Sequence, residues 1–397
     1  MEKKYYMGID VGSTTIKIYI TDQDDNCIYS KYERHYSDIQ ATIKTLINDV
    51  KEQFGNLEVT AVMTGSGGLS LSSCLDVKFV QEVIACTKTI ETYIPECDVA
   101  IELGGEDAKI TYFQGSLEQR MNGTCAGGTG AFIDQMASLL QTDAGGLNEL
   151  AKNYQMIYPI ASRCGVFAKT DVQPLINEGA NKEDIAISIF QAVVNQTISG
   201  LAWGKPIRGH VAFLGGPLHF LSELKEAFIR TLKLDDEHII APNHSHLFAA
   251  IGSALNSKRN VDIPLQTLQS RLANKIELEF EVERLEPLFA SSADYEEFTF
   301  RHAKHQVPVK DLASYQGKAF LGIDAGSTTT KAALVGEDGT LLYSFYHNND
   351  GDPLGTTIRA IKEIYSQLPE GVEIVHSCST GYGEALIKAA LLLDEGE

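Results

Sequence analysis

Residues Met7–Lys17 read MGIDVGSTTIK, and residues Leu321–Lys331 read LGIDAGSTTTK. A second pair of motifs follows each stretch at nearly the same distance, TGSG at residues 64–67 and TGYG at residues 380–383. Two matched motifs at matched spacing indicate an internal duplication, so the chain contains two related modules. The residues that recur are Gly8, Ile9, Asp10, Gly12, Ser13, Thr14, Thr15 and Lys17, which return as Gly322, Ile323, Asp324, Gly326, Ser327, Thr328, Thr329 and Lys331.

The apolar pattern of both copies predicts layered α/β structure. In each copy two β-rich stretches flank the Gly-Ser-Thr turn, which is typical of a hairpin, and a helical pattern and an apolar strand follow. Further strands and amphipathic helices alternate along the first module, which favours an α/β fold. The strands expected there are residues 99–103 and 211–214, and the helices are residues 132–140, 184–201, 222–232 and 247–257.

The two modules differ in extent. The first continues well beyond Gly67 with several more glycine motifs, whereas only residues 384–397 follow Gly383. We therefore expect a complete module over residues 1–257, a connector over residues 258–318, and the opening part of a truncated second module over residues 319–397.

Asp10 ends the first strand, and a turn of small residues follows it. The backbone N–H groups and hydroxyls of such a turn form a concave nest for phosphate oxygens, which the backbone can approach closely. A carboxylate repels phosphate, so we expect Asp10 to hold Mg²⁺ through water. Lys17 is either a positive charge for the phosphates or an ordinary solvated strand end. The expected nucleotide residues of this hairpin are Gly12, Ser13, Thr14, Thr15 and Lys17.

Two further glycine turns resemble the first. Residues 101–109, IELGGEDAK, place Glu102 at a strand end before two glycines and Asp107, and residues 213–217, FLGGP, lead from a strand into a helix. This order of turns is the pattern of the actin-like and sugar-kinase ATPases, in which two RNase H-like subdomains surround a nucleotide cleft. It predicts that ATP or ADP binds with Mg²⁺. The glycines expected to contact the nucleotide are Gly104, Gly105, Gly215 and Gly216.

Two of the seven cysteines stand out from the other five. Cys125 in NGTCAGGTGAF and Cys164 in SRCGVFAK each come just before a predicted helix. The positive end of a helix lowers the pKa of a thiol and suits a metal–thiolate centre. One chain offers too few such thiolates for an iron–sulfur cage, but a symmetric dimer would supply four. On the residues alone, the alternative that both are core thiols stays open.

The charge of the chain limits its partners. Formal net charge is −20, a sign that repels nucleic-acid backbones and anionic lipid surfaces. No apolar run approaches the ~20 residues of a spanning helix, and the N-terminus lacks the apolar region of a signal peptide. We expect a cytoplasmic protein that binds neither nucleic acid nor membrane.

The motifs together resemble those of the ATP-dependent activators of 2-hydroxyacyl-CoA dehydratases, which group with the ATPase subunits of benzoyl-CoA reductase. The resemblance covers residues 5–257 and resumes at residues 319–397, and CAGGTGAF and CGVFA are its most specific motifs. It implies a homodimer with one shared 4Fe–4S cluster, held by Cys125 and Cys164. It also implies ATP-driven electron transfer to a dehydratase or reductase component, with reduced ferredoxin or flavodoxin as donor.

Position 102 departs from the activators, which usually have aspartate there. The longer side chain leaves open whether Glu102 or Asp107 positions the attacking water. Two alternatives to the activator also stay open at this point. One is a small-molecule kinase of the acetylamino-sugar type with the same fold, and the other is a nucleotide-binding scaffold that does not hydrolyse ATP.

Overall fold

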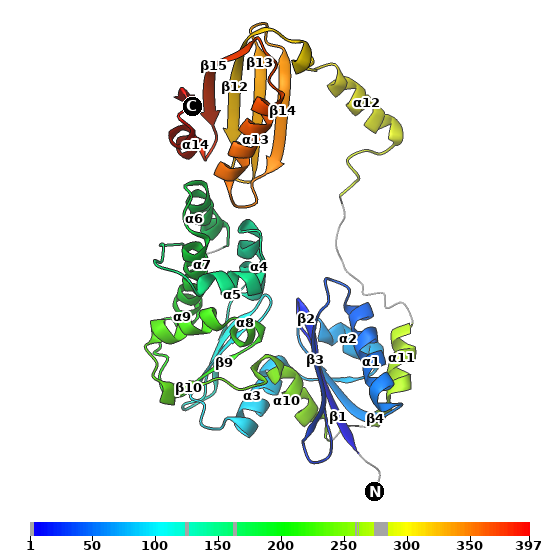
Figure 1. Ribbon diagram of the computed structural model, residues 1–397. Helices are drawn as coiled ribbons and strands as arrows, with labels where there is room; N and C mark the ends of the chain where they lie inside the picture. Colours follow the sequence, from blue (N-terminus) through cyan, green and yellow to red (C-terminus); the bar gives the residue numbers. More distant parts are fainter. Residues whose placement is uncertain (1–3, 124–126, 162–164, 259, 261, 274–284) are drawn as a thin grey trace. The chain divides into compact units, whose positions relative to one another are not determined.

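The computed structural model describes residues 4–123, 127–161, 165–258, 260, 262–273 and 285–397. The chain divides into two compact units (Figure 1). The first unit comprises Met1–Ser138, Thr142–Lys169 and Glu183–Leu278, and the second comprises Leu139–Gln141, Thr170–Lys182 and Glu279–Glu397.

The first sheet of the first unit has the strand order β11-β4-β1-β2-β3, with β5 also paired to β4. β1 and β2 form the predicted antiparallel hairpin, and β4 runs parallel to β1. The strands are β1 (Tyr5–Val11), β2 (Thr15–Thr21), β3 (Cys27–Arg34), β4 (Glu58–Thr64), β5 (Lys78–Phe79) and β11 (Asp262–Pro264), and the helices on this sheet are α1 (Ile39–Phe54), α2 (Gly68–Leu75) and α11 (Leu265–Ala273).

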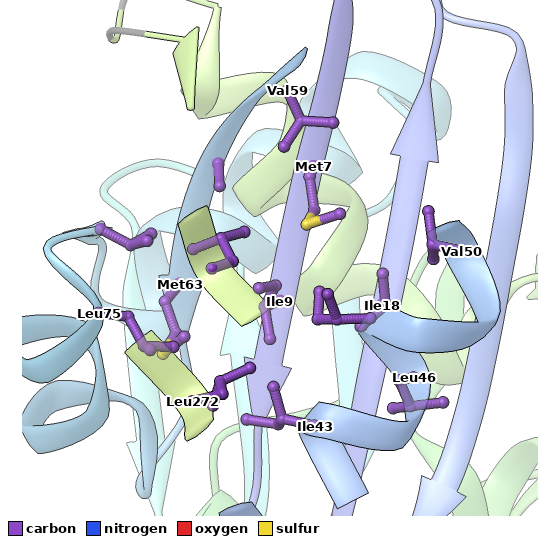
Figure 2. Packing of buried hydrophobic residues seen from close by; sticks show 14 of the residues in the cluster. Met7, Ile9, Ile18, Ile43, Leu46, Val50, Val59, Met63, Leu75 and Leu272 are labelled. Carbon is purple, nitrogen blue, oxygen red and sulfur yellow. The ribbon is translucent and has the colours of Figure 1, made fainter. Parts of the chain in front are cut away.

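The alternation along β1 decides what each face of this sheet contacts. Met7 and Ile9 point to one face, where they pack with Ile43 of α1, Met63 of β4 and Leu272 of α11 in a fully buried core (Figure 2). Because side chains alternate along a strand, Gly8 and Asp10 point to the opposite face. One face therefore holds this core, and Asp10 lies on the opposite face, near the end of the strand.

The second sheet has the order β10-β9-β6-β7-β8. It repeats the strand pairing of the first sheet, because β6 pairs antiparallel with β7 and parallel with β9. Its strands are β6 (Val99–Leu103), β7 (Ala108–Tyr112), β8 (Glu118–Met121), β9 (Val211–Leu214) and β10 (Ile239–Ile240). The helices of this part of the chain are α3 (Glu82–Tyr93), α4 (Gly130–Leu139), α5 (Ala144–Ala151), α6 (Gly165–Asn177), α7 (Lys182–Thr197), α8 (Gly216–Phe220), α9 (Ser222–Leu232) and α10 (Phe248–Ser257), with short turns η1 (Ile198–Ala202), η2 (Asp236–His238) and η3 (Ser245–Leu247).

We expected no apolar stretch near the length of a membrane-spanning helix, but the structure has one helix that reaches this length. Lys182–Ala202, which joins α7 to η1, is long and apolar enough by length and composition to cross a bilayer. However, 67% of its most apolar stretch is buried inside the structure, which is typical of the core helix of a folded domain.

The second unit contains a third sheet, of order β14-β13-β12-β15-β16. Its strands are β12 (Gly317–Ala325), β13 (Thr329–Gly336), β14 (Leu341–Asn348), β15 (Val372–Thr380) and β16 (Glu395–Gly396), and its helices are α12 (Ser292–Ala303), α13 (Pro353–Gln367) and α14 (Glu384–Leu391), with the short turn η4 (Leu312–Ser314). β12 pairs antiparallel with β13 and parallel with β15, as β1 does with β2 and β4. The predicted fold class, an actin-like ATPase fold followed by a partial second copy, is confirmed.

Two elements lie where the sequence predicted a connector. β11 pairs with β4, and α11 packs on the core of the first sheet. The compact first unit includes both of these elements. The apolar residues of α11 form only a short stripe, which the sequence alone did not separate from a linker.

Candidate nucleotide site

Asp10 lies at the end of β1, opposite Lys17 of β2 in the hairpin register. Lys17 Nζ is 2.9 Å from Asp10 Oδ2, and Asp10 as a whole is only 4% exposed. Burial raises the pKa of Asp10, although Lys17 opposes the shift. Asp10 Oδ1 is buried and has no hydrogen-bond partner in the part of the chain that the structure describes. This oxygen is therefore available to a ligand.

The turn after Asp10 is stabilised by backbone hydrogen bonds and by His35. The Gly12 N–H donates to the Thr15 carbonyl at 2.9 Å, and the His35 N–H donates to the Thr14 carbonyl at 3.2 Å. His35 Nε2 is also 3.2 Å from the Gly12 carbonyl. These bonds fix the turn without using the side chains of Ser13 and Thr14. His35 was not predicted from the sequence, because its role depends on the return of β3 beside β2.

The second hairpin places Glu102 opposite Lys109. Lys109 Nζ is 2.6 Å from Glu82 Oε1 and 3.6 Å from Glu102 Oε1. Burial opposes the charge on Lys109, but the carboxylates of Glu102 and Glu82 raise its pKa well above the ordinary value. Burial also raises the pKa of Glu102, whereas at Glu82 the attraction of Lys109 outweighs burial and lowers the pKa.

Glu82 was not predicted from the sequence, because it is the first residue of α3. An acidic residue in the first turn of a helix is ordinarily explained by the helix dipole. Only the three-dimensional contact with Lys109, from a strand far along the chain, assigns it to this site.

The two hairpin turns approach each other closely at Gly105. A Cβ atom on Gly105 would lie 2.2 Å from Thr14 Oγ1 and 2.9 Å from Ser13 Oγ, so a larger residue there would have to displace these two side chains. The turn itself is closed by a hydrogen bond from the Gly104 N–H to the Asp107 carbonyl, 2.7 Å long. The two turns thus face one another as the paired-hairpin motif predicts.

The third turn begins at Gly215, whose φ of +89° favours glycine. Its neighbour Gly216 is shielded by Tyr32, whose hydroxyl would lie 2.3 Å from a Cβ atom on Gly216. The Tyr32 ring also lies 5.5 Å from the ring of His246. Burial lowers the pKa of His246 to about 4, which keeps its imidazole neutral. The sequence did not indicate Tyr32 or His246.

All three turns line one cavity. The residues predicted from sequence that line it are Asp10, Gly12, Ser13, Thr15, Lys17, Glu102, Gly104, Gly105, Asp107, Gly215 and Gly216. Thr14 instead lines an adjoining, larger cavity, which shares Tyr32, Gly105 and Gly216 with the first. A polar chamber thus adjoins a roomier one, an arrangement that suits the phosphates and the nucleoside of one ligand.

Cys125 and Cys164 lie outside the described residues. The helices that follow them are present: α6 begins at Gly165, and α4 begins at Gly130, two residues before the helix expected over residues 132–140. The first turn of α4 is bonded to the second hairpin, because Gly130 N–H donates to the Gly104 carbonyl at 2.9 Å and Ala131 N–H to the Gly105 carbonyl at 2.7 Å.

A second contact ties α4 to the first hairpin. Arg34 at the end of β3 makes a two-point ion pair with Asp134 of α4, with Nη1–Oδ2 at 2.7 Å and Nη2–Oδ1 at 3.2 Å. The first turn of α4 is therefore bonded to the second hairpin, and Asp134 ties the same helix to β3 of the first sheet.

Comparisons with known proteins agree with this geometry. The model of the BadF/BadG/BcrA/BcrD ATPase family matches residues 7–257. A 2-hydroxyisocaproyl-CoA dehydratase activator of Clostridioides difficile is 28% identical over 63% of this chain and 94% of its own length. The (R)-2-hydroxyglutaryl-CoA dehydratase activating ATPase of Acidaminococcus fermentans is 29% identical over 53% of this chain and 82% of its own length.

A solved structure of similar fold is the activator of the 2-hydroxyisocaproyl-CoA dehydratase from Clostridium difficile with bound ADPNP. It is 26% identical with a TM-score of 0.57, and the match covers 71% of this chain and 100% of that one. The family model spans more than half of the chain and includes every turn of the cavity. The chain therefore belongs to the BadF/BadG/BcrA/BcrD ATPase family.

Proposed function

We propose that this chain hydrolyses ATP to drive an electron, through an iron–sulfur cluster, to an enzyme of the 2-hydroxyacyl-CoA dehydratase type. The observation that carries the ATPase part is the convergence of two acidic hairpins and a glycine turn on one cavity. The named relatives that activate dehydratases support the physiological role.

Mg²⁺ fits the donor set at the first hairpin. Asp10 Oδ1 is a buried carboxylate oxygen without a partner among the described residues, and it lines the phosphate chamber. Oxygen ligands of this kind suit Mg²⁺, which commonly keeps several waters and one or two carboxylates. A bound Mg²⁺ would offset the negative charge of the phosphates.

The protein groups position the reactants. In the proposed arrangement the backbone of the turns at Gly12–Thr15 and Gly104–Gly105 cradles the phosphates, while Gly215 and Gly216 accept the nucleoside. Lys17 and Lys109 place positive charge beside the transferred group. Phosphoryl transfer to water depends on such positioning and electrostatics more than on covalent chemistry.

Glu102 or Asp107 orients the attacking water. Both line the chamber, and Glu102 is a partly buried carboxyl with a raised pKa, as expected of a group that accepts a proton. Glu102→Gln and Asp107→Asn separate the two. The residue that orients the water is the one whose variant loses hydrolysis by about 100-fold while nucleotide affinity is retained.

Cys125 and Cys164 are proposed as ligands of a 4Fe–4S cluster, on the basis of their motifs and the family. Two thiolates from each subunit of a homodimer would make the four that the cluster needs. A bound cluster would supply the one-electron chemistry. The bonds from Gly130 and Ala131 to the Gly104–Gly105 turn offer a route from the nucleotide to the start of α4, the helix that follows Cys125 in the sequence.

The proposal also includes an electron donor, an electron acceptor and a cellular location. We propose a cytoplasmic homodimer that receives electrons from reduced ferredoxin or flavodoxin and delivers them to a dehydratase or reductase component. Nucleic acid and membranes are not among the proposed partners.

Iron analysis after purification without oxygen tests the cluster. We expect about four irons per dimer, lost in Cys125→Ser and in Cys164→Ser, because a serine hydroxyl does not replace a thiolate at iron. Cys97→Ser is the matched control, since that cysteine is buried elsewhere in the first unit. Full iron in either cysteine variant would exclude the bridging cluster while leaving the ATPase proposal intact.

A further inference from the structure

Two histidines lie side by side at the amino ends of two neighbouring strands of the second sheet. β9 and β10 run parallel with Val211 paired to Ile239, and His210 and His238 immediately precede this pair. The centroids of the two imidazole rings are 5.4 Å apart, and the rings are tilted by 34°. Gly215 of the candidate nucleotide site follows the other end of β9. The histidine pair therefore lies at the opposite end of the strand from the nucleotide cavity.

A carboxylate lies beside each imidazole. Asp98 Oδ2 is 3.4 Å from His210 Nδ1, and Asp235 pairs with His238 Nδ1. The Nδ1 atom of each ring therefore faces a carboxylate, whereas neither Nε2 atom has a partner among the described residues. A carboxylate on one ring nitrogen fixes the tautomer and increases the basicity of the other nitrogen, which is the usual environment of a histidine that binds a metal ion.

Asp98 is held in place by contacts that do not depend on the imidazole. It immediately precedes β6, which pairs in register with β9, so Asp98, His210 and His238 form one row across three parallel strands. Gln114 Nε2 donates to Asp98 Oδ1 at 2.8 Å, and the His210 N–H donates to Oδ2 at 2.8 Å. These two hydrogen bonds lower the pKa of Asp98, so the carboxylate beside His210 is ionised and has a fixed orientation.

The spacing of the two rings suits a single metal ion between them. A bond of about 2.0–2.1 Å from zinc to each imidazole nitrogen, at the tetrahedral angle, places the two ring centroids roughly 5 Å apart. The distance observed between His210 and His238 is 5.4 Å. Their side chains are 44% and 42% exposed, so an ion can reach both and complete its coordination with water.

We propose that His210 and His238 bind one divalent transition-metal ion, with Zn²⁺ as the representative of its class. Imidazole nitrogen suits Zn²⁺, Ni²⁺ and Cu²⁺, whereas Mg²⁺ prefers oxygen ligands, so this site is chemically distinct from the proposed magnesium site at Asp10. β10 is a two-residue strand at the edge of its sheet. The ion bridges β10 to β9 and fastens this edge, which makes the site structural.

Calorimetric titration of the full chain with Zn²⁺, after purification without oxygen, tests the proposal. We expect the unaltered chain to bind one more zinc ion than His210→Ala or His238→Ala, because each substitution removes one of the two imidazole ligands. Zinc bound by cysteines is common to all these proteins, so the difference isolates this site. Asp235→Asn should bind zinc at the same site about tenfold more weakly, because it removes a carboxylate that orients a ligand.

His376→Ala is the matched control. The His376 side chain is also 44% exposed, and its two ring nitrogens lie 3.8 Å from Asp394 and 3.5 Å from Glu395. It shares the exposure and the acidic neighbours of the pair but has no second imidazole beside it among the described residues. We expect this variant to keep the full zinc stoichiometry. Glutamine replaces alanine at positions 210 and 238 if the alanine variants do not fold.

Hydrogen exchange of β10 gives a second readout, which reports the proposed bridging of the edge strand. Zinc at about ten times its dissociation constant should slow exchange of the Ile239 and Ile240 amides about tenfold in the unaltered chain. The same addition should have no effect on these amides in His238→Ala. Mass spectrometry of the peptide that contains β10 measures the rates.

Two outcomes would overturn the proposal. Equal zinc stoichiometry in the unaltered chain and in both variants of the pair would show that the two imidazoles do not share an ion. Loss of a zinc ion in His376→Ala as well would show that single exposed histidines bind zinc without a built site. Neither outcome bears on ATP hydrolysis, which depends on the opposite end of the sheet.

Discussion

The two copies of the hairpin are nearly identical in backbone and different in environment. Gly65 and Gly381 both adopt a φ of +91°, and the Asp–Lys pair spans 2.9 Å in the first copy and 3.0 Å in the second. The Asp10 side chain is 6% exposed, whereas that of Asp324 is 42% exposed.

The difference shows what converts a turn into a site. The first hairpin faces Gly105, Glu82 and Lys109 from the second sheet of its own unit, and these groups bury Asp10 and set its charge environment. The described residues of the second unit include no counterpart of the β6–β7 hairpin. The motif alone specifies the fold of the turn, and the facing sheet supplies the chemistry.

The largest expected effect is on hydrolysis. Asp10→Ala should lower the ATP hydrolysis rate by about 100-fold or more, because it removes the proposed metal-positioning carboxylate. Asp324→Ala, the same change in the second copy, should leave the rate unchanged. Steady-state phosphate release checks both, and equal losses would contradict the assignment of the site to the first copy.

Substitutions at Gly8 and at its repeat Gly322 compare the packing of the two copies through the stability of the protein. Gly8→Ala should lower the free energy of unfolding by about 3 kcal/mol, because the new methyl group would overlap the α10 backbone. Gly322→Ala should leave it unchanged or raise it by up to about 1 kcal/mol, since the space is open and alanine restricts the unfolded chain. Urea denaturation measures both, and similar losses would refute the difference in packing.

Glu82→Gln separates positioning from nucleotide binding. The substitution removes the 2.6 Å ion pair with Lys109 but retains the shape of the side chain. We expect kcat to fall about tenfold with little change in KM, because Lys109 is displaced toward Glu102 while the phosphate turns are intact. Glu363→Gln in the second unit is the control. A change in KM alone would instead place Glu82 among the nucleotide contacts.

The smallest expected effect concerns pH and stability. Burial raises the pKa of Glu102 above its unfolded value, so this carboxyl stabilises the fold at low pH, and that stability is lost as pH rises through the folded pKa. Glu102→Gln should therefore raise the free energy of unfolding at pH 7 by about 1 kcal/mol, with the gain vanishing below about pH 4. Denaturation at both pH values measures this, and a loss of stability at pH 7 would contradict the sign.

What the sequence predicted well was local. The hairpins, the turn glycines and the α/β class follow from apolar alternation and small residues, which act over a few positions, and the duplication made the Asp10 turn unmistakable. His35, Tyr32 and Glu82 could not be found this way, because each gains its role from a partner on a distant element. β11 and α11 were missed for the same reason, since their pairing with the first sheet spans about 200 residues of sequence.

The number of nucleotides bound per chain tests the central claim most directly. Calorimetric titration of the full chain with ADP and Mg²⁺ should give one site per chain, abolished by Asp10→Ala and retained in Asp324→Ala. Two sites per chain, or loss of binding in Asp324→Ala, would contradict the account that only the first hairpin, facing the second sheet of its own unit, forms a nucleotide site.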